Sequence, residues 1–325
     1  MKNIIVTGAA GFIGTNLIEK LLKTKEYRII GVDNFNPYYD VRIKEENVQR
    51  NLRSTLFDCI NADITDQNKI DEVFKYAKYE FKKEPIDAVV HLAAQAGVGY
   101  SIEHPLEVID TNIKGFDIMI RKSHEYGVKH FIYASSSTVL GDHDGIYEQK
   151  SPYGVTKATN EAQGRMYAKL FGDMQITGLR LYTVYGEWMR PDLAIAKFSK
   201  AIWTDDEIHI FGNGNIYRDF TYIDDVTEAF KVMIDSEPKY NGKVYDVGNG
   251  KPYSLLELID IMKKVYHRED YDKVVYEGEK PYDAHLTTAW AGGLKDDFGF
   301  YCKVGLEEGL TRFAAWSTAQ RKMYW

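Results

Sequence analysis

A tyrosine and a lysine four positions apart, Tyr153 and Lys157, have the spacing in this sequence that most directly suggests chemistry. In a helix the two side chains would lie on one face, one turn apart. Ser151 and Pro152 just before them are typical of a helix start. An ammonium group beside a phenol favours the phenolate, so Tyr153 could take a proton from an alcohol near neutral pH. The same spacing also occurs by chance on ordinary exposed helices, so the rest of the chain must support it.

A run of four hydroxyl residues, Ser135–Thr138, follows the strand predicted over 129–134. The carboxyl ends of strands in an open α/β sheet border the crevice in which ligands bind. We therefore expect these hydroxyl groups at the same crevice as the helix that begins near Tyr153.

A glycine-rich turn connects the apolar strand predicted over 2–7 to a helix with apolar residues at helical spacing. In this context Gly8 and Gly11 let the backbone approach a pyrophosphate, and Gly14 lets helix and strand pack closely. The N-terminus of the helix offers free N–H groups and the positive end of its dipole. The segment therefore predicts a dinucleotide-binding turn.

Two aspartates that follow strands could complete such a site. Asp33 ends the strand predicted over 28–32, at the distance typical of the acidic residue that binds the adenosine ribose. Its carboxylate would repel a 2′-phosphate, which favours NAD over NADP; the alternative is an aspartate that only caps a turn. A third short strand is predicted to end over 62–66. Asp63 in this stretch could contact the adenine amino group or cap the helix predicted over 69–81.

The remaining pattern alternates strands with helices, which predicts a doubly wound parallel sheet of the Rossmann type. A fourth strand over 86–94 ends in small residues that leave room for a flat cofactor, and His91 within it is interpreted as a packed histidine rather than a base. A long helix is predicted over 107–126. The expected NAD-binding domain comprises 1–181 with 216–250 returning to it, and a smaller α/β domain for substrate comprises 182–215 and 251–325.

Composition narrows the possible partners. The 325 residues carry a net charge of −7 and contain no basic block, which argues against nucleic acid and anionic membranes as partners. The two cysteines, Cys59 and Cys302, have no metal-type spacing, so neither a metal site nor a disulfide framework is expected. No signal peptide or membrane-length apolar run is recognisable, and a cytoplasmic protein is expected.

Six motifs occur in one order along nearly the whole chain. They are Thr7–Gly14, Asp33–Asn34, His91–Ala94, the run Ser135–Thr138, Tyr153 with Lys157, and Arg218–Asp225. With these motifs the chain resembles the extended short-chain dehydrogenase/reductase family of nucleotide-sugar epimerases and dehydratases. Within that family, three stretches are similar to the branch of glucuronate 4-epimerases. These stretches are Asp33–Asp40, Ala93–Val98 and Tyr182–Asp192.

The resemblance implies NAD as the cofactor and gives roles to the matching residues. Tyr153 would be the acid and base, Lys157 its electrostatic partner and a ligand of the nicotinamide ribose, and Ser136 the partner of the reacting hydroxyl. The implied cofactor-binding residues are Gly8, Gly11, Phe12, Ile13, Gly14, Asp33, Asn34, Asp63, Ile64, Leu92, Ala93 and Ala94, together with Tyr153 and Lys157. The implied substrate-binding residues are Ser136, Ser137, Thr138, Thr183, Arg190 and Arg218.

The implied reaction is inversion at C4 of a UDP-sugar through a transient 4-keto intermediate, with UDP-glucuronate converted to UDP-galacturonate. Alternatives are a 4-epimerase of a neutral hexose or N-acetylhexosamine, a dehydratase or decarboxylase, and a non-catalytic NAD-binding module. The dehydratases of the family need an acidic pair at positions 137 and 138, and the decarboxylases a glutamate at 138. Ser137 and Thr138 carry no carboxyl group, which favours the epimerase. The complete set of Ser136, Tyr153 and Lys157 argues against a silent module.

The sequence departs from the glucuronate branch at four places. Gly99 stands where an arginine is usual, which bears on substrate identity. Leu140 replaces a tyrosine, Trp290 replaces an aspartate, and the segment from Gly141 to Lys150 is several residues shorter than is common. The shorter segment bears on loop contacts to the sugar.

A homodimer is expected from the same resemblance. The helices around 107–126 and 153–170 resemble the pair that forms a four-helix dimer interface in the family. An apolar stripe on the first helix could supply the contact, or its residues could face the sheet instead. The stripe comprises Ile109, Ile113, Phe116 and Ile120.

Overall fold

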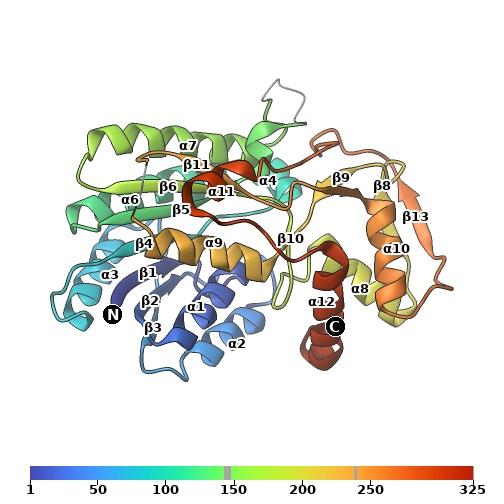
Figure 1. The fold of residues 1–325 in the computed structure, drawn as a ribbon, viewed down its shortest axis with the longest axis horizontal. Helices are drawn as coiled ribbons and strands as arrows, with labels where there is room; N and C mark the ends of the chain where they lie inside the picture. The colour runs from blue at the N-terminus through green and yellow to red at the C-terminus, as the bar shows by residue number, and fades with distance from the viewer. Residues whose placement is uncertain (143–147, 238–239, 325) are drawn as a thin grey trace.

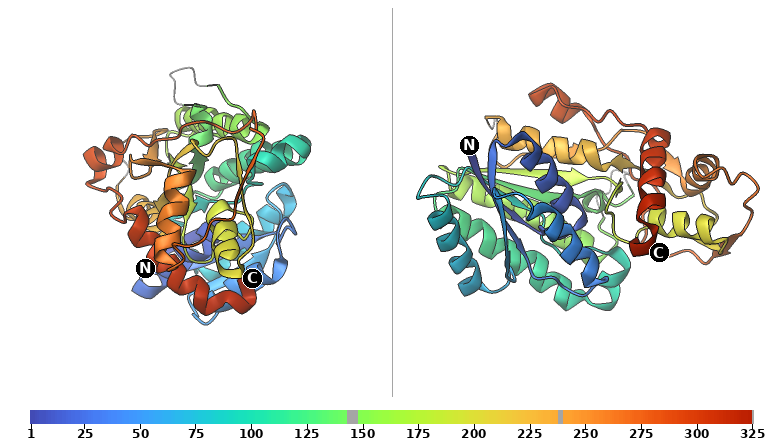
Figure 2. Two further views of the ribbon diagram at one scale, coloured as in Figure 1. Left: turned by 90° about the vertical axis from the view of Figure 1, so that its right-hand side faces the viewer. Right: turned by 90° about the horizontal axis from the view of Figure 1, so that it is seen from below.

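The computed structural model describes residues 1–142, 148–237 and 240–324. It shows a large lobe built on a parallel β-sheet and a smaller lobe of short strands and helices beside it (Figure 1). A view from below shows the two lobes side by side, with the N-terminus in the large lobe and the C-terminus at the small one (Figure 2, right).

The central sheet has seven strands, in the order β11-β6-β5-β4-β1-β2-β3, and every pairing is parallel. The chain winds outward in both directions from β1 and β4, so the strand order reverses between these two neighbours. Such a switch point opens a crevice at the carboxyl ends of the strands. The strands are β1 (Lys2–Thr7), β2 (Tyr27–Asp33), β3 (Phe57–Asn61), β4 (Ala88–His91), β5 (His130–Ser136), β6 (Gln175–Leu181) and β11 (Val244–Val247).

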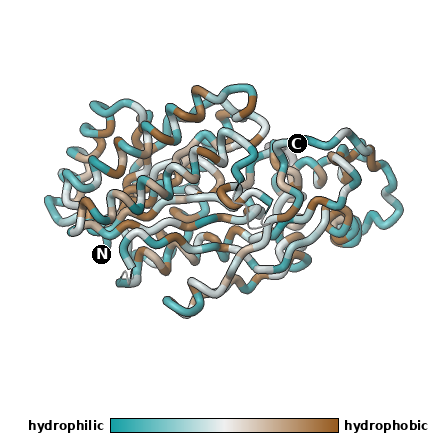
Figure 3. The backbone as a smooth tube through the Cα atoms, turned by 90° about the horizontal axis from the view of Figure 1, so that it is seen from above, coloured by the Kyte–Doolittle hydropathy of each residue, from teal (hydrophilic) through white to brown (hydrophobic). Residues whose placement is uncertain are grey.

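Helices cover both faces of this sheet and bury two separate apolar cores. The predicted doubly wound sheet is therefore confirmed. One face is covered by α1 (Phe12–Thr24), α2 (Val41–Asn51), α9 (Ile223–Asp235) and α11 (Gly292–Phe298). The other face is covered by α3 (Gln67–Glu80), α6 (Gly115–Glu125) and α7 (Pro152–Leu170). Hydrophobic segments concentrate in the interior, and the outer turns are mostly hydrophilic (Figure 3).

The small lobe has a third apolar core of its own. Its two-stranded sheets and helices come from both sides of α9 in the sequence. These elements are β7 (Val184–Tyr185), β8 (Ile208–Phe211), β9 (Tyr217–Asp219), β10 (Thr221–Tyr222), β12 (Pro252–Ser254), β13 (Val274–Glu277), α8 (Ala194–Thr204), α10 (Leu255–Val265) and α12 (Leu306–Tyr324).

Two elements differ from their predicted positions. The third strand, β3, lies over Phe57–Asn61, so it ends just before Ala62 instead of closing over 62–66. The helix predicted over 107–126 consists of α5 (Pro105–Ile109), a π-helical turn over Asp110–Lys114 and then α6. A π turn takes up an extra residue, which rotates the following helix relative to the preceding one.

This rotation splits the apolar stripe expected at a dimer interface. Phe116 and Ile120 are fully buried against the sheet, in the core between α3, α6 and α7. Ile109, before the π turn, is 43% exposed, and Leu106 beside it is 79% exposed. The four residues therefore do not form one exposed stripe, because two of them belong to the core.

Within the described ranges, no helix is both long enough and apolar enough to cross a lipid bilayer. No group of three or more potential metal ligands is found among the same residues.

Candidate active site

A cleft of about 470 Å³ lies at the carboxyl ends of the strands, between the two lobes. It brings together every residue implied for the cofactor and the substrate except Asp63. Residues of the glycine turn, of the segment after β4 and of the Ser135–Thr138 run line its large-lobe side. The small lobe contributes Arg218 and the segment from Tyr282 to Ala284.

The glycine turn forms a close-packed cradle at the start of α1. Gly8 has a φ of +70°, and a Cβ added there would lie 2.9 Å from the backbone nitrogen of Ala93. A Cβ at Gly14 would lie 2.1 Å from the carbonyl oxygen of Gly8, so only glycine fits at this helix–strand contact. The open backbone of the turn and the N-terminus of α1 suit the pyrophosphate of a dinucleotide.

Asp33 ends β2 with its carboxylate buried in the cleft. One carboxylate oxygen accepts the amide of Ala10 at 3.0 Å and the other accepts the amide of Phe35 at 2.9 Å. Burial raises the pKa of Asp33, while the charge of Lys44 and the two amides act in the opposite direction. The site is therefore compatible with a carboxylate that accepts ribose hydroxyl groups.

Asp63 lies next to this site but does not line the cleft. One of its oxygens accepts the amide of Asn34 at 2.8 Å, and the other accepts the backbone and hydroxyl of Thr65 at 2.8 and 2.7 Å. The helix α3 is capped by Asp66 and not by Asp63. In this structure Asp63 orients Asn34, which does line the cleft.

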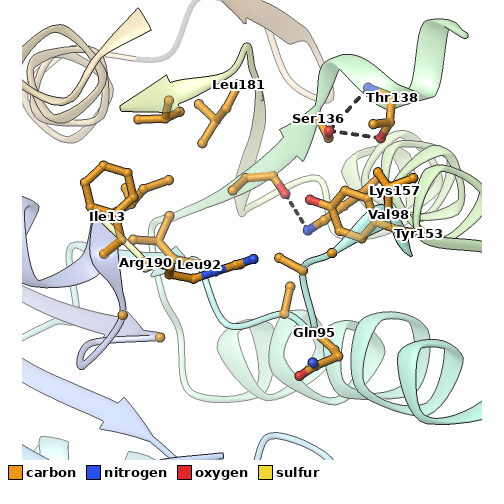
Figure 4. Close-up of a pocket in the computed structure, with 18 of the residues that line it drawn as sticks. Ile13, Leu92, Gln95, Val98, Ser136, Thr138, Tyr153, Lys157, Leu181 and Arg190 are labelled. Carbon is orange, nitrogen blue, oxygen red and sulfur yellow. Dashed lines mark hydrogen bonds between the residues drawn. The ribbon is translucent and has the colours of Figure 1, made fainter. Parts of the chain in front are cut away.

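The tyrosine and lysine lie together on α7, as the spacing predicts. Ser151 caps the helix by accepting the amide of Gly154 at 3.1 Å, and Pro152 occupies its first turn. Lys157 donates to the carbonyl oxygen of Ala134 at 2.9 Å, and its ammonium lies 5.9 Å from the centre of the Tyr153 ring. Figure 4 shows both side chains in the cleft, with Lys157 directed at the end of β5.

Burial governs the protonation of both groups. It raises the pKa of Tyr153, against a hydrogen bond from Ser136 and the positive charge of Arg190. It also lowers the pKa of Lys157 to about 8. The expected lowering of the Tyr153 pKa by Lys157 is not found, because the ammonium is held by Ala134 instead of by the phenol.

The hydroxyl residues Ser135–Thr138 lie at the end of β5, where the strand passes into a 3₁₀ turn. Ser136 accepts the hydroxyl of Thr138 at 2.9 Å and its amide at 3.2 Å, as the dashed lines in Figure 4 show. Ser136 and Ser137 are buried, and all of Ser135–Thr138 lines the cleft. The cleft therefore presents hydroxyl groups and no carboxyl group beside Tyr153, within the part of the chain that is described.

His91 is a packed histidine, as interpreted from the sequence. Its Nδ1 lies 2.9 Å from the hydroxyl of Thr7, and its ring stacks against Phe131. Burial and the charge of Lys157 lower its pKa to about 3, so it stays neutral at physiological pH.

The side of the cleft that the resemblance assigns to the substrate contains two arginines, each hydrogen-bonded to an aspartate. Arg190 makes a two-pronged contact with Asp192 at 2.9 and 2.8 Å, and its guanidinium points toward Tyr153 and Lys157 (Figure 4). Arg218 donates to Asp283 at 2.6 Å. Both arginines line the cleft, as does Thr183 between β6 and β7.

Two of the departures from the glucuronate branch, Gly99 and the shortened segment, lie near this side of the cleft. A Cβ at Gly99 would have the Tyr282 hydroxyl as its nearest neighbour, 4.0 Å away, so Tyr282 approaches the position where an arginine is usual. In the shortened segment 141–150, Asp142 pairs with Lys150 and accepts the amide of His285 at 2.7 Å; positions 143–147 lie outside the described residues. Leu140 ends a 3₁₀ turn.

The sequence model of the NAD dependent epimerase/dehydratase family matches residues 4–248 of this chain. The chain belongs to this family. Its members use NAD, and the glycine cradle, Asp33 and the pair on α7 fit that cofactor.

Relatives in the family extend over almost the whole chain. A UDP-glucuronate 4-epimerase of Thermodesulfobacterium geofontis is 34% identical, and the match covers 98% of this chain and 96% of the relative. A crystal structure of the UDP-glucuronic acid 4-epimerase of Bacillus cereus, with UDP-glucuronic acid and NAD, has a TM-score of 0.89 at 29% identity and covers 98% of this chain and 99% of that one. The UDP-glucose 4-epimerase of Thermotoga maritima, with UDP-glucose, has a TM-score of 0.86 at 30% identity, with the same two coverages.

The site also contains residues that the sequence did not single out. Glu161, one turn after Lys157 on α7, is buried and accepts the hydroxyl of Ser135 at 2.7 Å. Arg180 on β6 donates hydrogen bonds to both oxygens of the same carboxylate, at 2.7 and 2.8 Å. The only sequence signal for Glu161 is its spacing of four from Lys157, which continues the face that carries Tyr153.

Proposed function

We propose that this protein is an NAD-dependent 4-epimerase of a UDP-sugar, and that it converts UDP-glucuronate to UDP-galacturonate. The main support is the cluster of hydroxyl groups at Ser136–Thr138 next to Tyr153. Positions 137 and 138, which carry carboxyl groups in other enzymes of the family, carry none here. The named relatives support a 4-epimerase, and two of those described above act on the acid sugar.

The chain supplies position and a proton carrier for this reaction. In the proposal Tyr153 acts as the phenolate, which the hydrogen bond from Ser136 and the charge of Arg190 favour against the effect of burial. It removes the C4 hydroxyl proton and later returns it to the oxygen, with Ser136 holding the reacting hydroxyl. Lys157 anchors the end of β5 through Ala134 and keeps a positive charge in the cleft. The chemistry that NAD supplies when bound is reversible acceptance of a hydride, the C4 hydrogen with its two electrons.

The acid sugar makes a special demand on the site. Its 4-keto form is a β-keto acid, which loses carbon dioxide when the C5–C6 bond aligns with the carbonyl π system. Ser137, Thr138 and Thr183 can hold the carboxylate by hydrogen bonds without adding a base. Arg190 already gives two of its nitrogen donors to Asp192, so it offers this carboxylate at most its remaining donors.

The second candidate is a 4-epimerase of a neutral UDP-hexose. It is favoured by Gly99, which removes the usual arginine, and by the similar fold of the Thermotoga maritima enzyme. The deciding measurement is kcat/KM for UDP-glucuronate, UDP-glucose and UDP-N-acetylglucosamine, with product stereochemistry determined by NMR. We expect the acid sugar to have the highest value; a neutral sugar preferred tenfold or more would overturn that choice and leave the epimerase proposal in place.

We also propose the domain division and the dimer. The cofactor-binding unit would be 1–181 with 216–250, and the sugar-nucleotide unit 182–215 with 251–325, with the cleft between them. Two parts of these ranges lie on the other side: β9 and β10 belong to the small lobe, and α11 packs on the central sheet. A homodimer would form through α5 and α7, whose outer faces carry several exposed apolar residues. These are Leu106, Ile109, Val155 and Met166.

A further inference from the structure

Lys44 is a buried lysine on α2 whose side chain faces the cleft. Its side chain is 9% exposed, and its ammonium nitrogen lies 3.9 Å from Oδ1 of Asp33. The nitrogen also lies 4.9 Å from the centre of the Tyr39 ring. Among the described residues, no oxygen lies within hydrogen-bonding distance of this ammonium group.

This ammonium group has three N–H donors, and it is open to the cleft rather than fully enclosed by protein. Asp33 cannot fully satisfy it, because 3.9 Å is beyond hydrogen-bonding distance and both carboxylate oxygens already accept backbone amides. Burial lowers the pKa of Lys44, while the charge of Asp33 raises it. The acceptors for its donors therefore lie in the cleft, either in solvent or in a bound ligand.

The occupant of this part of the cleft is the adenosine half of NAD. Asp33 marks the ribose position, and the cradle of Gly8 and Gly11 marks the pyrophosphate. Both ribose and phosphate present oxygen acceptors, and phosphate oxygens form strong charge-assisted bonds with an ammonium group. We propose that Lys44 is a cofactor-binding residue that donates to oxygen atoms of the ADP-ribose half of NAD.

The position of Lys44 also bears on the choice between NAD and NADP. Asp33 and Lys44 place opposite charges side by side at the ribose, so the negative charge that rejects a 2′-phosphate is partly offset. Removing the charge of Asp33 leaves the ammonium group of Lys44 facing the 2′ position. The gain in NADP binding in Asp33→Asn should therefore depend on Lys44.

Binding of NAD and of ADP-ribose to the full chain, without sugar, tests the proposal by isothermal titration calorimetry. Lys44→Met keeps the length of the side chain and removes the donors. We expect its Kd to rise at least tenfold for both ligands, because the contact belongs to the half that they share. Arg42→Met is the matched control: Arg42 lies on the same helix, but its side chain is 85% exposed, and its Kd should stay within twofold of wild type.

The second arm uses NADP. Asp33→Asn should bind NADP at least tenfold more tightly than wild type, and Asp33→Asn with Lys44→Met should lose that gain. A Kd of Lys44→Met within threefold of wild type, or a loss for NAD but not for ADP-ribose, would overturn the proposal. Thermal unfolding without ligand checks folding, and Lys44→Gln replaces Lys44→Met under the same criteria if the latter does not fold. Because no sugar is present, these outcomes do not depend on the proposed substrate.

Discussion

Ser135 at the end of β5 donates a 2.7 Å hydrogen bond to Glu161 on α7. This bond fixes the strand that carries Ser136 to the helix that carries Tyr153 and Lys157. Arg180 on β6 holds the same carboxylate by two bonds, so three elements meet at one buried charge. Glu161 thereby positions the proposed catalytic groups, which it does not itself touch.

The variant Glu161→Gln tests this positioning role. A neutral amide removes the stronger of the two charge pairs of Arg180, which keeps only Asp246 at 3.4 Å among the described residues, and we expect a loss of about 2–3 kcal/mol in the free energy of unfolding. We also expect kcat to fall more than KM changes, because the distance between Ser136 and Tyr153 is no longer fixed. Denaturant unfolding and steady-state kinetics measure the two effects. Arg165→Met, which removes only an exposed partner of Glu161 at 3.5 Å, is the control.

Tyr153→Phe should lower kcat at least about a hundredfold, the usual scale for a general acid and base. NAD should still bind, because the ring and Lys157 remain. Tyr79→Phe, at a side chain that is 78% exposed, removes a hydroxyl far from the cleft and should be fully active. Turnover of Tyr153→Phe near the wild-type rate would remove Tyr153 from its proposed role.

The low pKa of Lys157 predicts a pH dependence of stability for the cofactor-free protein. Burial lowers this pKa to about 8 in the folded state, below the ordinary value near 10.4 of an unfolded lysine. The unfolded chain therefore binds more protons between these two values, and the contribution of Lys157 to stability rises with pH across that window. We expect Lys157→Met to be more stabilising relative to wild type at pH 7 than at pH 10. Thermal unfolding of both proteins at the two pH values measures this; an equal difference at both would contradict the burial of a charged Lys157.

Gly99→Arg should shift selectivity toward the acid sugar. The backbone has room for a side chain, because the nearest atom to an added Cβ is the Tyr282 hydroxyl at 4.0 Å. A hydrogen bond to a charged group contributes about 1.5–3 kcal/mol, so kcat/KM for UDP-glucuronate relative to UDP-glucose should rise roughly tenfold or more. Gly99→Met is the control for size. An equal effect of both variants would assign the change to shape rather than to charge.

Leu106→Glu should separate the proposed homodimer into monomers. Leu106 is 79% exposed on α5, and a carboxylate there would be buried in an apolar contact between two copies. Sedimentation velocity at micromolar concentration distinguishes the two states. Tyr276→Glu, at a 57% exposed side chain on β13 in the small lobe, should not change the mass. A monomeric wild-type protein would count against the dimer.

Local signals in the sequence were sufficient for much of the fold and for the centre of the site. The glycine turn, the end of β2 at Asp33 and the helix start before Tyr153 each depend on residues close in sequence. Contacts between distant segments were not predictable in this way. Lys44 meets Asp33 only because α2 packs against α1, and Glu161 meets Arg180 only because α7 packs against β6.

The two elements that differ from their predicted positions do so for local reasons. A π turn has no clear sequence pattern, so the rotation that buries Phe116 and leaves Ile109 exposed could not be anticipated. For α3, Asp63 and Asp66 both precede the expected helix start, and the choice of Asp66 as its cap depends on where β3 ends.

The position of β11 has a consequence for synthesis of the chain. After β6 the polypeptide leaves the sheet, builds part of the small lobe and returns through α9, so β6 pairs with β11 more than sixty residues later. On the ribosome, β6 therefore keeps an unpaired edge until Val247 has emerged, and α1 stays uncovered by α9 until Asp235 has emerged. Long-range pairing of this kind is slow and leaves strand edges open to aggregation. A fragment that stops at residue 181 would keep that edge unpaired permanently, so the complete sheet cannot be obtained from an N-terminal fragment that ends at β6.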